Sequence, residues 1–138
     1  MNTATWVSGK NVLLVEDDPA VRESIKLMLN IDRHTVTEAG NGHQALQLFT
    51  GSRYDLVITD YLMPEMLGDE LAQNLKNRTP SQPVLMVTAY PERLADARNS
   101  ADAVLAKPFG LEGLRQAVAK SIQTTPSVDA AASSLSGG

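Results

Sequence analysis

The sequence predicts an α/β fold in which five strands alternate with five helices, a (βα)₅ pattern. Two observations predict it. Short, continuous apolar runs recur along the chain, and such runs are typical of strands buried on both faces of a parallel sheet. Each run is followed by a segment whose apolar residues have helical spacing. This alternation favours a doubly wound, five-stranded parallel sheet with helices on both faces.

The individual elements follow from these runs and from the residues that start or stop helices. Apolar runs predict strands at residues 11–15, 55–60, 84–87 and 103–106, and residues 34–39 are interpreted as a further strand. Pro19 suits the first turn of a helix that continues to about residue 30, and a short helix follows the turn at 40–42. Apolar spacing predicts helices at about 67–77 and 111–122, and Pro91 suits the start of a short helix at about 91–98 with a weak apolar face. Right-handed crossovers then favour the flavodoxin-like strand order 2-1-3-4-5.

One domain accounts for most of the 138 residues. We expect residues 1–10 to be a flexible lead-in and residues 11–123 to form the domain. Residues 124–138 are rich in Ser, Thr, Ala and Gly, so we expect a disordered tail. Such a tail suits either a free end or the start of a linker, and the chain is therefore either a complete protein or a module of a longer one.

Composition excludes several classes of function. The chain has no cysteine, which rules out disulfides and thiolate chemistry. Its formal net charge of −4, without a block of Lys or Arg, argues against direct binding of nucleic acid. No apolar run approaches the roughly 18 residues of a membrane span, and the first ten residues lack the apolar core of a signal peptide. We therefore expect a cytoplasmic protein that does not associate with membranes.

Acidic residues follow two strands that the predicted order makes neighbours. Glu16 and Asp17 follow the first strand, and Asp60 ends the third. In the order 2-1-3-4-5, the connections from the first and third strands lead to opposite sides of the sheet. Ligands of such sheets bind in the crevice between these two strand ends. Carboxylates crowded there would bind a cation, and oxygen ligands without nitrogen or sulfur suit Mg²⁺. The sequence thus predicts a Mg²⁺ site with Asp60 at its centre.

Two further strands bring complementary groups to the same edge, a hydroxyl at Thr88 and an ammonium at Lys107. A metal, a cation and a hydroxyl around a carboxylate suit phosphoryl transfer, since they offer a nucleophile and positive charge for the phosphoryl oxygens. Each residue alone has an ordinary structural explanation, as a turn residue, a helix cap, a surface charge or a favourable charge at a helix N-terminus. Four strand ends with complementary groups at one edge favour the functional interpretation.

Over residues 11–123 the sequence resembles the receiver (CheY-like) domain of two-component response regulators. The resemblance rests on motifs that occur in the usual order: Glu16-Asp17, Asp60, Met63-Pro64 with Gly68, Thr88-Ala89 and Lys107-Pro108. It implies that Asp60 accepts a phosphoryl group from a phosphohistidine of a sensor histidine kinase or phosphotransfer protein. It also implies a Mg²⁺ ion held by Glu16, Asp17, Asp60 and the backbone carbonyl of Leu62.

The same resemblance implies roles for the remaining motif residues. Lys107 would pair with Asp60 and then with the phosphoryl oxygens, and Thr88 would donate a hydrogen bond to the phosphoryl group. A cis peptide bond is expected before Pro108. Asp18 lies one place beyond the acid pair of the family, so we expect it to cap the following helix.

The sequence also departs from the family's pattern. Val104 stands where many members have an aromatic residue, so the relay that couples this ring to the threonine should be absent or rebuilt. The interval from Thr88 to Lys107 is about three residues short, which predicts a shortened fourth helix or an abridged loop after it. Leu62 and Tyr90 should flank the phosphoryl group without a carboxylate or amide to position water, which predicts slow self-hydrolysis.

The predicted function is therefore a phosphorylation switch, not an enzyme with an outside substrate, and its output is contact with a downstream protein target. One alternative is a receiver module of a longer regulator or hybrid histidine kinase. A less favoured alternative is a small Mg-dependent phosphatase that works through an aspartyl phosphate, and a third is a receiver-like module that binds partners without phosphate. A homodimer is left open. The histidines, His34 and His43, are expected at the solvated surface.

Overall fold

A computed structural model of the chain describes residues 6–50, 53–95 and 100–124. Five parallel strands form one sheet in the order β2-β1-β3-β4-β5. This confirms the predicted fold and strand order. The strands are β1 (Asn11–Val15), β2 (Thr35–Ala39), β3 (Leu56–Asp60), β4 (Val84–Thr88) and β5 (Ala103–Ala106).

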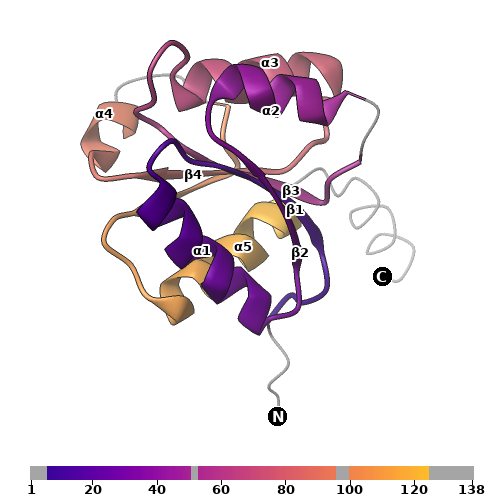
Figure 1. The fold of residues 1–138 in the computed structure, drawn as a ribbon, viewed down its shortest axis with the longest axis vertical. Helices are drawn as coiled ribbons and strands as arrows, with labels where there is room; N and C mark the ends of the chain where they lie inside the picture. Colours follow the sequence, from indigo (N-terminus) through magenta and orange to yellow (C-terminus); the bar gives the residue numbers. More distant parts are fainter. Residues whose placement is uncertain (1–5, 51–52, 96–99, 125–138) are drawn as a thin grey trace, which may run out of the picture.

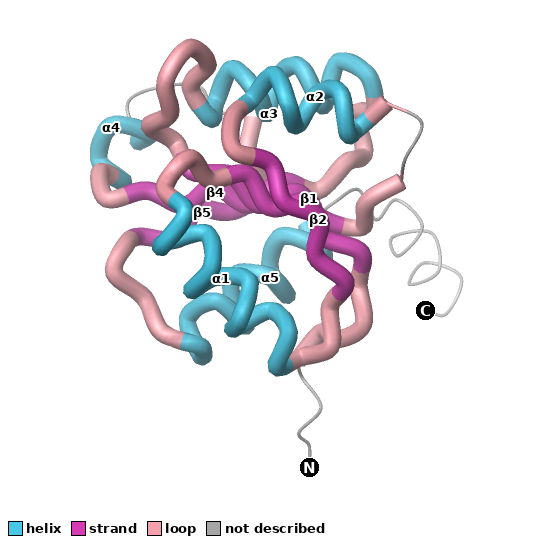
Figure 2. The backbone as a smooth tube through the Cα atoms, viewed as in Figure 1, coloured by secondary structure: helices cyan, strands magenta, loops and turns pink. Residues whose placement is uncertain are grey.

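The helices cover both faces of the sheet, as Figure 1 and the tube in Figure 2 show. On one face lie α1 (Pro19–Ile31) and α5 (Leu111–Thr124), and on the other lie α2 (Gly42–Phe49) and α3 (Gly68–Arg78). The short α4 (Pro91–Ala95) contributes Leu94 to the core on the face of α2 and α3. The helix predicted at 91–98 falls partly on residues 96–99, which lie outside the described residues.

Two hydrophobic cores form because successive strand residues point to opposite faces of the sheet. Leu13, Val57 and Met86 pack with α2 and α3, whereas the alternating Leu14 and Ile58 pack with α1 and α5. The central strands are buried on both sides, which explains why their sequences are continuously apolar. The register aligns Val15 with Thr59, Asp60 with Val87, and Thr88 with Ala106, so the carboxyl ends of these strands share one edge.

The described part of the expected lead-in, residues 6–10, contacts the domain. The Trp6 ring lies under the guanidinium of Arg115, 5.4 Å from the ring centroid, and Val7 packs on the core beside α1 and α5. The N–H of Lys10 donates to Nδ1 of His34 at 3.0 Å. Residues 1–5 of the lead-in and residues 125–138 of the expected tail lie outside the described residues.

The expectation of two solvated histidines is wrong for His34, which is only 6% exposed, although His43 is exposed. His34 lies at the end of the turn after α1, where Val7, Lys10 and α5 cover the same edge of the sheet. Within the described ranges, no helix is both long enough and apolar enough to cross a lipid bilayer.

Candidate functional site

Three carboxylates meet at the carboxyl edge of the sheet. Glu16 and Asp17 come directly after β1, and Asp60 is the last residue of β3, so the parallel pairing of the two strands brings them together. One oxygen of each carboxylate lies within 4.8 Å of the others. Glu16 is 2% exposed, Asp60 is half-buried and Asp17 faces solvent. A set of oxygen ligands open to solvent on one side fits a hard divalent cation such as Mg²⁺.

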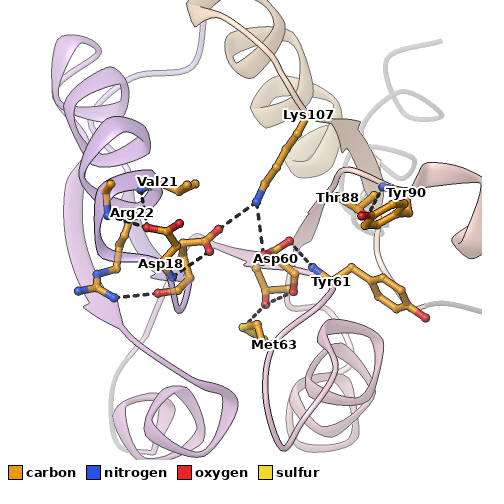
Figure 3. Close-up of polar contacts among 12 residues, drawn as sticks. Asp18, Val21, Arg22, Asp60, Tyr61, Met63, Thr88, Tyr90 and Lys107 are labelled. Carbon is orange, nitrogen blue, oxygen red and sulfur yellow. Dashed lines mark hydrogen bonds and ion pairs between the residues drawn. The ribbon is translucent and has the colours of Figure 1, made fainter.

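Lys107 closes this group of carboxylates (Figure 3). Its Nζ lies 3.3 Å from Oε1 of Glu16 and 3.3 Å from Oδ2 of Asp60. The backbone N–H of Lys107 donates to the carbonyl of Thr88 at 2.8 Å, which continues the pairing of β4 with β5. The Lys107–Pro108 peptide bond is cis, and this confirms the expectation for that bond.

Backbone donors hold the other oxygens of Asp60 and Glu16. The N–H of Tyr61 donates to Oδ1 of Asp60 at 2.8 Å, and the N–H of Asp18 donates to Oε2 of Glu16 at 3.1 Å. Asp18 itself caps α1, since its Oδ1 accepts from the N–H of Ala20 at 2.9 Å. The prediction that Asp18 is a helix cap is therefore confirmed. The carboxylates of Asp60 and Glu16 are thus each held by Lys107 at one oxygen and by a backbone N–H at the other.

Burial raises the pKa of Asp60, although Lys107 and the N–H of Tyr61 oppose that rise. Burial likewise raises the pKa of Glu16, with the charge of Asp60 adding to the effect and the N–H of Asp18 and Lys107 opposing it. For Lys107, burial lowers the pKa, but the charges of Asp60 and Glu16 outweigh it, so its pKa is raised. At both carboxylates the effect of burial on the pKa therefore outweighs the opposing effect of Lys107.

Thr88 ends β4 and is 1% exposed. Its Oγ1 accepts the N–H of Tyr90 at 2.8 Å, which leaves the hydroxyl hydrogen available to a further acceptor. In Figure 3, Asp60 lies between the turn that carries Asp18 and the strand end that carries Thr88. A group attached to Asp60 would therefore have an ammonium and a hydroxyl donor nearby.

The remaining residues singled out from the sequence border this edge. Leu62 and Tyr90 are exposed, and neither side chain carries a carboxylate or an amide. The Tyr61 ring points away from the Asp60 carboxylate (Figure 3), although Tyr61 itself lies just beyond the end of β3. Val104 is exposed on β5. Sequence reasoning missed Arg22, whose guanidinium reaches the backbone of the acidic turn; a basic residue one turn into the helix after an acidic pair was the available signal.

The chain matches the model of the response regulator receiver domain family over residues 12–119. It is 39% identical over 106 residues to response regulator MprA of Mycolicibacterium vanbaalenii, an alignment that covers 75% of this chain and 46% of that protein. The chain therefore spans about half the length of the curated relatives it matches.

Solved structures of similar proteins share the fold. Response regulator TrrA of Thermotoga maritima, solved with Mg²⁺ and BeF, has a TM-score of 0.76 and 33% identity, over 80% of this chain and 97% of that one. The receiver domain of a sensor histidine kinase from Pseudomonas aeruginosa, with a magnesium ion in its active-site cleft, has a TM-score of 0.76 and 26% identity. That alignment covers 85% of this chain and all of the other, 100%.

Proposed function

The chain belongs to the response regulator receiver domain family, and from that membership we propose that Asp60 is its phosphoacceptor. The observation that supports this most is the contact of one ammonium, Lys107, with both Asp60 and Glu16 beside the exposed Asp17. Phosphorylation of Asp60 would switch the contacts of the domain with other proteins by adding charge at the sheet edge. The domain proposed for this role comprises residues 11–123.

The proposed reaction takes the phosphoryl group from a phosphohistidine of a sensor histidine kinase or phosphotransfer protein. An oxygen of Asp60 forms a bond to phosphorus, and the phosphorus–nitrogen bond breaks. The imidazole nitrogen of the donor keeps the electron pair and takes up a proton. Lys107, which contacts Asp60, would stabilise the charge that develops on the phosphoryl oxygens, and Thr88 would donate its hydroxyl hydrogen to one of them.

Mg²⁺ fits the donor set of this site. The carboxylates of Glu16, Asp17 and Asp60, with the backbone carbonyl of Leu62, would hold it. When bound, the ion supplies positive charge that offsets the charge of the phosphoryl oxygens. Burial is the main cause of the raised pKa values of Glu16 and Asp60, and a bound cation would offset the cost of keeping these carboxylates charged there.

Incubation with Mg²⁺ and acetyl phosphate, followed by intact mass, tests the assignment. We expect the gain of one phosphoryl group in the wild type and none in Asp60→Asn. Asp18→Asn is the matched control, since it removes a neighbouring carboxylate but keeps an oxygen that can cap α1. Labelling that persists in Asp60→Asn, or is lost in Asp18→Asn, would contradict the proposal.

The phosphatase alternative is not favoured. Membership of the receiver family indicates a switch, and Leu62 lies where a second acid would serve a phosphatase. Steady turnover of a phosphoester by the purified protein would reverse this conclusion. The kinase, the downstream target, a homodimer and a cytoplasmic location stay predictions, as does membership of a longer regulator or hybrid kinase.

A further inference from the structure

Arg22, on the first turns of α1, is hydrogen-bonded to the backbone of the acidic turn. Its Nη1 donates to the carbonyl oxygen of Glu16 at 2.8 Å, while its Nε donates to Oε1 of Glu38 at 3.1 Å (Figure 3 shows the first of these contacts). The side chain is 23% exposed, so water competes with these bonds only in part. One guanidinium thus connects α1, β2 and the turn that carries two of the three carboxylates.

Glu38 is itself held in place. Its Oε2 accepts from Nζ of Lys26 at 3.1 Å, so both of its oxygens have cationic partners. The hydrogen bond from Lys26, followed by that from Arg22, lowers the pKa of Glu38, and this carboxylate therefore stays charged. Glu38 pairs with Leu14 in the register of β2 with β1, which places it close to the end of β1.

The contact of Arg22 controls the peptide unit between Glu16 and Asp17. The N–H of Glu16 donates to the carbonyl of Ala39 at 3.0 Å, and Oε2 of Glu16 accepts from Asp18. Oε1 of Glu16 pairs with Lys107, and the carbonyl oxygen, the one polar group of Glu16 left, accepts from Arg22. Since this planar peptide unit joins Glu16 to Asp17, holding its carbonyl restrains the backbone position from which the Asp17 side chain extends toward Asp60.

We propose that Arg22 is a positioning residue for the cation site, holding the acidic turn in the conformation that brings Asp17 and Glu16 to the ion shared with Asp60. This inference rests on the proposed function. The fork of the guanidinium is needed because two acceptors, the Glu16 carbonyl and the Glu38 carboxylate, are bound at once. A lysine ammonium is a compact point charge on a flexible stem and does not reproduce that planar fork.

Electrostatics and positioning predict opposite effects when Arg22 is replaced by Met. Removing a positive charge beside a cation site would by itself strengthen Mg²⁺ binding. If Arg22 positions the turn, Mg²⁺ binding weakens instead. Residues that orient metal ligands typically change affinity by about 10- to 100-fold when mutated. We therefore expect the Mg²⁺ dissociation constant to rise by about tenfold or more in Arg22→Met and in the charge-conserving Arg22→Lys.

Lys26→Met is the matched control. It also removes one positive charge and one contact to Glu38, but it leaves the bond from Arg22 to the Glu16 carbonyl. Its dissociation constant is expected to stay within about twofold of the wild-type value. Titration calorimetry with MgCl₂ on unphosphorylated protein measures all four constants, and urea unfolding establishes that each variant is folded.

Hydrogen exchange without Mg²⁺ gives a second readout that does not depend on the metal. The amide of Asp18 donates to Glu16, so its exchange is expected to accelerate in Arg22→Met and Arg22→Lys but not in Lys26→Met. Wild-type affinity or unchanged Asp18 exchange in both Arg22 variants would overturn this inference alone. A wild type that binds no Mg²⁺ and gains no phosphoryl group would overturn the proposed function, and this inference with it.

Discussion

Gly68, the first residue of α3, is packed against the backbone of Asp60, and its replacement by alanine tests that packing. Its N–H donates to the carbonyl of Tyr61 at 2.7 Å. A Cβ atom at Gly68 would overlap the carbonyl oxygen of Asp60 and would lie 2.9 Å from Cα of Tyr61 and 2.7 Å from Sδ of Met86. Two of these three neighbours are backbone atoms of Asp60 and Tyr61, and backbone atoms cannot rotate aside as a side chain can.

The expected cost follows from this overlap. Inserting a methyl group into a filled core costs about 1–3 kcal/mol, and the upper end applies where backbone must move. Alanine recovers at most about 1 kcal/mol as the better helix former. We therefore expect Gly68→Ala to lower the free energy of unfolding by about 2 kcal/mol. With a urea dependence of about 1.5 kcal/mol per molar, the urea midpoint falls by about 1.3 M.

Urea unfolding followed by circular dichroism measures this shift, with Gly113→Ala as the control. Gly113 lies within α5, where a Cβ atom would meet Cβ of Phe109 at 3.7 Å and Cδ1 of Leu105 at 3.8 Å, both ordinary contacts. Gly113→Ala should therefore stabilise the protein by about 0.5–1 kcal/mol. Equal midpoints for wild type and Gly68→Ala would refute the reasoning, as would equal losses in the two variants.

Three further predictions concern other parts of the domain. Leu67 occupies the N-cap of α3 without a side-chain hydrogen bond, so Leu67→Asp should stabilise the protein by about 1 kcal/mol in urea unfolding, and Leu67→Ala should not. Burial lowers the pKa of His34, so protonation favours the unfolded chain: stability is complete above a pH of about 6.5 and declines as the pH falls below it. The urea midpoint of the wild type should therefore fall as the pH is lowered below about 6.5, whereas the midpoint of His34→Gln should not. An equal fall in His34→Gln would contradict the prediction. Leu62→Asn combined with Tyr90→Glu should speed loss of the phosphoryl label by at least about tenfold, since a positioned acid or base contributes on the order of 100-fold; an unchanged rate would show that these positions do not limit hydrolysis.

The fold could be predicted from the sequence because its signals are local. Runs such as residues 12–15 and 84–87 are apolar without interruption, and a strand buried on both faces is their ordinary explanation. The gathering of Glu16, Asp60 and Lys107 could be predicted because parallel strands bring their carboxyl ends to one edge. Neither step required knowledge of side-chain conformation.

The features that could not be predicted depend on side chains that meet across the fold. The neighbours of His34 in the sequence are polar, which indicates an exposed residue. His34 is nevertheless buried, because residues 6–10 and α5 cover it. The contact of Arg22 with the Glu16 carbonyl depends on where β2 places Glu38, since that carboxylate orients the guanidinium. The spacing of residues along the sequence predicts neither the contact of His34 with Lys10 nor that of Arg22 with the Glu16 carbonyl.

The charges of the site explain why phosphorylation should depend on a divalent cation. Glu16, Asp17 and Asp60 carry three formal negative charges and Lys107 one positive, so −3 + 1 leaves −2. A phosphoryl group approaches with further negative charge, and the repulsion is stronger here than in water because Glu16 is buried. Protonation is the other way to relieve this charge, and the raised pKa values of Glu16 and Asp60 point in that direction. A proton on Asp60 would remove the proposed nucleophile, however, whereas a bound cation would relieve the charge and leave the carboxylate ionised.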